Sequence, residues 1–102
     1  MNNMQQILAR AQKLQAKVNE AQKKLDKEEV TGTSASGAVT IVMTVKGDIK
    51  SISIDKEIVN PEEKDILEDL ILAAFNDAKS KADSRYETEM KEATGGLNIP
   101  GF

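Results

Sequence analysis

Five basic residues recur along the N-terminal segment at spacings of three, four, seven and three: Arg10, Lys13, Lys17, Lys24 and Lys27. In a helix these spacings place the five side chains on one face, here called the basic stripe, with Glu20 in its gap. Lysine is a flexible point charge that suits contact with phosphate oxygens without reading bases. The basic stripe therefore has the chemistry of a surface for polyanions with weak sequence preference.

A solvated face that keeps a helix soluble is the alternative interpretation of the basic stripe. Such a face usually mixes both signs through pairs four residues apart, whereas only Glu20 interrupts this one. The charge balance along the chain points the same way. Residues 1–25 carry a net charge of +4 and residues 26–102 a net charge of −7, which leaves −3 in total. A basic arm on an acidic body favours a polyanionic partner.

The other residues with possible chemistry are clustered carboxylates: Glu62, Glu63, Asp65, Glu68 and Asp69. A metal site or an acid–base pair is one use for them, and compensation of a helix dipole is the other. The chain has no histidine and no cysteine, and no glycine-rich phosphate loop accompanies the carboxylates. We therefore favour dipole compensation and predict no catalytic residue, metal ligand, cofactor or small-molecule substrate. The protein is not expected to be an enzyme.

Aromatic residues are scarce, with only Phe75, Tyr86 and Phe102. Proteins that bind RNA on a sheet, or single strands in a groove, need aromatic stacking platforms, so these classes are disfavoured. No segment is long and apolar enough to span a bilayer, and residues 1–6 lack the basic and apolar regions of a signal peptide. We expect a cytoplasmic protein with no membrane partner.

The basic stripe requires a long helix, which is predicted over residues 2–28. Apolar residues at alternating spacings of three and four form a narrow heptad seam: Met4, Ile7, Ala11, Leu14, Val18, Ala21 and Leu25. A helix of about 25 residues is ~38 Å long, whereas a globular chain of this size has a diameter of ~26 Å. Part of the helix is expected to overhang or to meet another subunit. Packing of the whole seam within its own subunit is the alternative.

A three-stranded antiparallel sheet is predicted after this helix. Alternating apolar and polar residues indicate strands at 38–45 and 49–54, joined by a tight turn at Gly47. Residues 30 and 31 favour a further strand, with Gly32 and Gly37 expected to bracket a turn or bulge.

A second long helix should begin at Asn60 and Pro61 and stop at the glycine pair 95–96. Its wide apolar face, with Phe75 in the core, should cover one side of the sheet. The expected fold is one α+β domain over residues 1–102, an α-β-β-β-α subunit. In it, residues 2–28 form a projecting basic helix, residues 30–94 the body and residues 95–102 a flexible tail.

Several segments resemble the YbaB/EbfC family of nucleoid-associated DNA-binding proteins, and together they cover nearly the whole chain. They are the Met-, Gln- and Lys-rich first helix ending in Glu29-Val30-Thr31-Gly32, residues 38–55, residues 61–71, residues 73–78, Thr94-Gly95-Gly96-Leu97 and Pro100-Gly101-Phe102. The stretch 67–78 and the Gly-Gly-Leu tail are the most specific, because neither follows from general helix chemistry.

The resemblance implies a tight homodimer with projecting first helices, binding to duplex DNA and location in the bacterial nucleoid. It transfers no DNA-contact motif position by position, so the site residues are those of the basic stripe and only their assignment to DNA comes from the family. We thus expect a protein that binds duplex DNA, changes its conformation or organisation, and influences gene expression. The alternative is a coiled-coil interaction or chaperone-like protein that grips a protein client, which would need exposed apolar residues at the helix tips.

Overall fold

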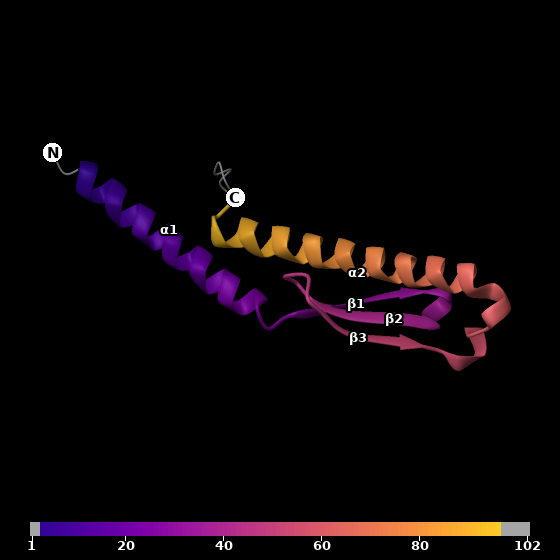
Figure 1. Cartoon of the computed structure of the whole chain (residues 1–102). Helices are drawn as coiled ribbons and strands as arrows, with labels where there is room; N and C mark the ends of the chain where they lie inside the picture. The colour runs from indigo at the N-terminus through magenta and orange to yellow at the C-terminus, as the bar shows by residue number, and fades with distance from the viewer. Residues whose placement is uncertain (1–2, 97–102) are drawn as a thin grey trace.

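The structure, a computed structural model, describes residues 3–96 and confirms the α-β-β-β-α order. Helix α1 (Asn3–Leu25) precedes strands β1 (Glu29–Ser34), β2 (Val39–Thr44) and β3 (Ile49–Ile54), and helix α2 (Lys64–Ala93) follows them. Figure 1 shows α2 lying lengthwise along the sheet while α1 extends away from one end. The molecule is accordingly elongated, with extents of 74 × 20 × 16 Å.

The predicted first helix is too long at its C-terminal end. α1 ends at Leu25, and the amide of Glu28 donates to the Leu25 carbonyl in the turn that follows (3.2 Å). The Glu28 carbonyl then accepts the amide of Val45 beside β2 (3.1 Å), so the backbone has already joined the sheet. Lys27 therefore lies in the turn and not on the helix.

Short 3₁₀ turns lie between β1 and β2 and between β3 and α2. They span Ala35–Gly37, Lys56–Ile58 and Pro61–Glu63. The Asn60 side chain accepts the amide of Glu62 (3.0 Å), as expected for a residue that caps a helical start. At the far end, the amide of Gly96 donates to the Lys91 carbonyl (2.8 Å), and φ is positive at both Gly95 and Gly96. This glycine pair ends α2 as predicted. The predicted flexible tail lies, from residue 97 onward, outside the described residues.

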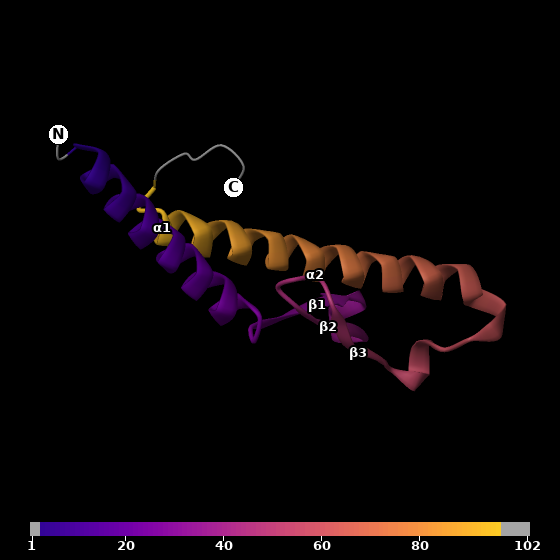
Figure 2. The ribbon, with the colours of Figure 1, turned by 60° about the vertical axis from the view of Figure 1, so that its left-hand side comes forward.

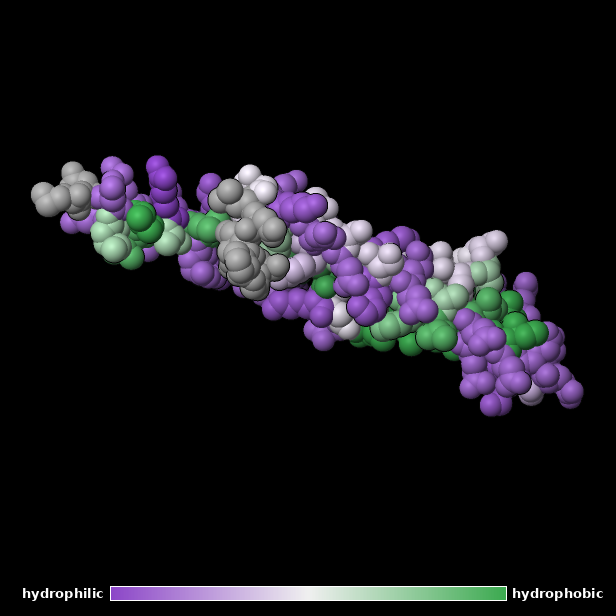
Figure 3. Space-filling view, turned by 90° about the horizontal axis from the view of Figure 1, so that it is seen from above, coloured by the Kyte–Doolittle hydropathy of each residue, from purple (hydrophilic) through white to green (hydrophobic). Residues whose placement is uncertain are grey.

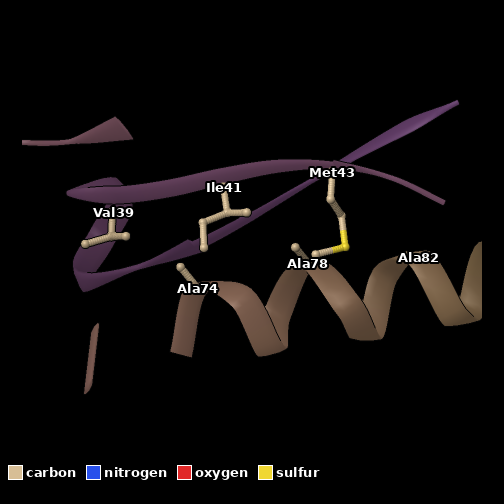
Figure 4. Packing of buried hydrophobic residues seen from close by; sticks show 6 residues of the cluster. All are labelled: Val39, Ile41, Met43, Ala74, Ala78 and Ala82. Carbon is tan, nitrogen blue, oxygen red and sulfur yellow. The ribbon is translucent and has the colours of Figure 1, made fainter. Parts of the chain in front are cut away.

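The main core lies between α2 and one face of the sheet. The strands are antiparallel in the order β1-β2-β3. The alternation predicted for the second strand is confirmed, because Val39, Ile41 and Met43 are all buried against α2. Figure 4 shows them facing the alanine row of α2, which is Ala74, Ala78 and Ala82. Small side chains at four-residue intervals let the helix approach the sheet closely.

The approach is closest at Gly32. This glycine is the buried centre of β1 and pairs with Ile41 in a regular antiparallel register. The turn predicted between Gly32 and Gly37 is therefore confined to Ala35–Gly37, and its predicted start at Gly32 is wrong. A Cβ built on Gly32 would overlap the Ala74 carbonyl oxygen and the Ala78 amide nitrogen. Glycine is required here because the backbone of α2 occupies the space of a side chain.

Side chains of α2 also cover the outer edge of β1. The Asp77 carboxylate accepts the backbone amide of Thr33 (3.0 Å), and Lys81 Nζ donates to the Thr31 carbonyl (2.9 Å). The pKa of Asp77 is lowered, first by the hydrogen bond from Thr33 and then by Lys81. These bonds satisfy strand groups that would otherwise be open to pairing with another chain.

The opposite edge of the sheet is less covered. Ile49 and Ile52 of β3 pair with Met43 and Ile41, so they lie on the α2 side of the sheet, yet they are 47% and 50% exposed. Phe75, predicted in the core, packs against the core cluster but is only partly buried. The reason is that α2 packs over β1 and β2 and leaves β3 to one side.

We predict that Gly32→Ala destabilises the protein by about 1–3 kcal/mol or more, since the added methyl group meets backbone atoms that cannot rotate away. Chemical denaturation followed by circular dichroism measures the change. Thr33→Ala, an exposed neighbour on the same strand, is the control and should cost less than about 1 kcal/mol. Equal stabilities of the Gly32→Ala variant and the parent would contradict the close approach.

Candidate nucleic-acid interface

The basic stripe lies on α1, where no Gly or Pro interrupts the helix. Four of its five predicted members are on the helix and are exposed to solvent: Arg10, Lys13, Lys17 and Lys24. The fifth, Lys27, is exposed in the following turn. The structure therefore brings four of the residues together on one face and separates the fifth by ending the helix early.

The heptad seam beside the stripe is buried over only half of its length. Val18, Ala21 and Leu25 pack against Val45 and Met90 of the same subunit. Towards the N-terminus, Met4 and Ile7 are 65% and 59% exposed. The second half of the seam thus packs within its own subunit and the first half overhangs, so packing of the whole seam within the subunit is wrong, and contact with another subunit stays a prediction.

Two adjoining hollows separate α1 from the C-terminal end of α2, and the stripe borders both. The outer hollow, about 360 Å³, has Arg10, Lys13 and Lys17 on one side and Ala93 to Gly95 on the other. The inner hollow, about 330 Å³, is lined by Lys17, Glu20, Ala21, Lys24, Glu89, Glu92 and Ala93. Figure 2 shows the end of α2 beside the middle of α1. The outer hollow is basic, whereas the inner one mixes both signs.

Acidic residues of α2 reduce the positive charge at the inner end of the stripe. Lys24 Nζ lies 3.4 Å from Glu89 Oε1, a carboxylate whose side chain is only 10% exposed. Within residues 3–96, Arg10, Lys13 and Lys17 enter no ion pair. Of the four stripe residues on α1, only Lys24 is therefore paired with a carboxylate, and the three nearer the N-terminus are not.

The same carboxylate belongs to a network at the base of α1. Arg85 of α2 donates from Nε and Nη2 to both oxygens of Glu28 (2.7 and 2.9 Å) and lies 2.9 Å from Glu89 Oε2. The hydrogen bond from Arg85 holds the pKa of Glu28 below its usual value, and the same bond raises the pKa of Arg85. Sequence reasoning missed this network because Glu28 and Arg85 are 57 residues apart.

The carboxylates at and before the start of α2 contact neighbouring side chains. Lys64 pairs with Glu68 (3.4 Å), and the Asn60 side chain donates to Glu63 (3.0 Å). Across the described part of the chain, no group of three or more acidic residues is arranged to hold a metal ion. Nor is any described helix long and apolar enough to cross a membrane.

The sequence matches a known protein family over almost the whole chain. The family model of the YbaB/EbfC DNA-binding family matches residues 1–97. The chain belongs to the YbaB/EbfC DNA-binding family. A nucleoid-associated protein of Rhodospirillum rubrum is 45% identical over 100 residues, which are 98% of this chain and 94% of that protein. A nucleoid-associated protein of Rickettsia felis is 42% identical over 103 residues, covering all of this chain and 96% of the relative.

A solved structure confirms the fold of this family member. The crystal structure of an uncharacterized protein from Helicobacter pylori superposes with a TM-score of 0.70, covering 82% of this chain and 88% of that one. Its sequence identity is 17%, so the likeness concerns the fold alone. The helix–sheet–helix order is thus shared at low sequence similarity.

We predict that Glu28→Gln lowers the thermal midpoint at neutral pH, because a neutral amide accepts weaker hydrogen bonds from Arg85. Since the folded state lowers the pKa of Glu28, its contribution is present above the unfolded pKa of about 4.3 and is lost as pH falls through the folded pKa. The difference between parent and variant in thermal scans should therefore close as the pH falls from about 5 towards 2.5. Glu87→Gln, an exposed carboxylate on α2, is the control and should change little. A difference independent of pH would refute this role of Glu28.

Proposed function

We propose that this protein is a nucleoid-associated protein that binds duplex DNA through phosphate contacts from the basic stripe. The observation that carries the proposal is the exposed cationic face of α1, whose outer members Arg10, Lys13 and Lys17 have no acidic partner within the described residues. A cation without an intramolecular partner can neutralise a DNA phosphate and release the counterion condensed there. This release favours binding. Membership of a DNA-binding family and relatives named as nucleoid-associated proteins support the same function.

The dimensions of the stripe suit a duplex. From Arg10 to Lys24 the helix rises about 21 Å at 1.5 Å per residue, roughly two thirds of a DNA helical turn of about 34 Å. An α-helix with its side chains is about 10–12 Å wide, close to the width of the major groove. Flexible lysines in such a position contact phosphates on the groove walls, so binding should depend little on sequence.

We further propose that a second copy of the chain covers the β3 patch, defined as Ile49 and Ile52 with the partly buried Ile54 and Phe75. Figure 3 shows hydrophobic side chains gathered along the half of the molecule that holds the N-terminal part of α2. The outer edge of β1 is covered by Asp77 and Lys81, whereas every β3 residue except Ile54 is exposed. An exposed apolar patch beside an uncovered strand edge favours pairing with a like surface. A two-fold dimer would present two basic arms.

A role in gripping a protein client is the second candidate. It is favoured by the exposed apolar residues near the outer end of α1, where Met4, Ile7 and Leu8 are 65%, 59% and 53% exposed. The two functions separate experimentally. Ile7→Ser with Leu8→Ser should leave DNA affinity nearly unchanged if the stripe binds DNA, and a loss of DNA binding in this variant would count against the stripe.

The dimer proposal predicts that Ile52→Lys yields a folded monomer at tens of micromolar, because a charge would have to be buried without a partner. Sedimentation equilibrium reports the mass, for which one chain is 11.1 kDa. Ser51→Lys adds the same charge one residue away on the other face of β3 and should stay dimeric. An Ile52→Lys variant that remains a dimer would place the interface elsewhere.

The DNA proposal predicts that Lys13→Glu with Lys17→Glu abolishes binding, since repulsion replaces attraction at four positions per dimer. For the parent, log K should fall with log salt at a slope of roughly −4 to −5 if about four to six side chains meet phosphates. Anisotropy titrations on random duplexes at several salt concentrations measure both quantities. Lys64→Glu with Lys79→Glu makes the same charge change on α2 and should bind far better than the stripe variant. Unchanged affinity in the stripe variant, with the dimer intact, would reject this function.

A further inference from the structure

α1 is attached to the body over a short distance. Its only buried residues within the described helix are Val18, Ala21 and Leu25, all in its C-terminal third. The first half, which carries Arg10 and Lys13, has no buried residue. The direction of the basic arm is therefore decided at the junction between the end of α1 and the body.

The length of α1 makes this junction sensitive. The helix has 23 residues, so at 1.5 Å per residue it acts as a lever of about 35 Å. A rotation of about 10° at Leu25 would move the outer end by about 6 Å, more than the ~3.4 Å of duplex axis that separates successive phosphates of one strand. A DNA-binding arm of this kind requires a restraint against rotation.

Arg85 supplies the centre of such a restraint. It lies on α2, and its guanidinium bonds both oxygens of Glu28 in the turn after α1 while lying 2.9 Å from Glu89. Glu89 in turn pairs with Lys24 in the last turn of α1 (3.4 Å). The network thus ties the helix end and the turn behind it to the same two residues of α2.

The surroundings of the network support a positioning role. Arg85 and Glu28 have side chains 31% and 28% exposed, and Glu89 only 10%, so water screens these contacts less than those of a free surface pair. On the other side of the turn, Asp26 pairs with Lys46 at 2.6 Å, but both of these side chains are much more exposed. Only the planar guanidinium can bind one carboxylate through two parallel bonds and reach a second.

We infer that Arg85 is a positioning residue for DNA binding: it fixes the angle at which α1 leaves the body, and so the placement of the basic stripe. This inference rests on the proposed function, because the arm is taken to bind DNA. Arg85 itself need not touch DNA. Its loss would spread α1 over many directions, and affinity would fall in proportion to the fraction of molecules with the arm correctly placed.

The direct test measures the arm angle without DNA. The chain has no cysteine, so nitroxide labels can be placed at Gln6→Cys on α1 and Asn76→Cys on α2. Pulsed electron–electron double resonance then measures the distance between the two labels. Diluting labelled chains into unlabelled ones ensures that this distance is within one chain, whatever the oligomeric state. Arg85→Met should broaden the distance distribution. Arg85→Lys should broaden it as well, because an ammonium keeps the charge but cannot form the two parallel bonds.

A second measurement connects the angle to binding. In Arg85→Met, DNA affinity should fall about tenfold if about one molecule in ten keeps the arm in place, while the salt slope stays that of the parent because the stripe is intact. Lys79→Met removes the exposed pair with Asp83 (3.1 Å) and is the matched control, expected to change neither readout. If Arg85→Met does not fold, Glu28→Gln weakens the same contact and takes its place.

The outcomes are separable from those for the function itself. Broadening together with weaker binding at an unchanged slope supports the inference. A distribution as narrow as that of the parent overturns it, whatever the affinity. If the parent does not bind DNA, the proposed function fails while the distance measurement still decides whether Arg85 fixes the arm.

Discussion

The contact on which the remaining structure depends is the approach of α2 to β1 at Gly32. A helix normally rests on side chains of a sheet, but here its backbone lies where a Cβ would be, with Ala74 and Ala78 on either side of the glycine. Glycine and alanine side chains cannot adjust, so the helix has one axial position on the strand. This axial position determines which groups the other side chains of α2 can reach.

Two consequences follow along α2 in opposite directions. Beside Gly32, Asp77 and Lys81 meet the free amide and carbonyl of β1 and cover that edge, whereas β3 is left beyond the reach of the helix. Further along, α2 continues past the sheet and carries Arg85, Glu89 and Met90 to the end of α1. The position of α2 on β1 thus accounts both for the exposed surface that we propose a second copy covers and for the contacts that hold the base of α1.

The basic residues of α1 have different surroundings at its two ends. Near its base, Glu89 of α2 pairs with Lys24, and Arg85 of α2 binds Glu28 in the turn that follows, so charge there serves structure. Beyond the end of α2, Lys13 and Arg10 face a hollow with no acidic side chain among its lining residues. Within α1, the positive charge that no carboxylate neutralises therefore lies on the N-terminal side of Lys24.

The sequence by itself determined the elements, because they follow from local periodicity. The alternation of residues 39–43 predicted the buried face of β2, and Asn60 with Pro61 predicted a helical start that is the 3₁₀ turn Pro61–Glu63, whereas α2 itself begins at Lys64. The family, too, could be recognised from the segments around residues 67–78. Only the tertiary structure decided the role of Gly32, the end of α1 before Lys27, the partial exposure of Phe75 and the pairing of Lys24 with Glu89. Each of these depends on a partner far away in the chain, and a local pattern of residue types does not contain the position of such a partner.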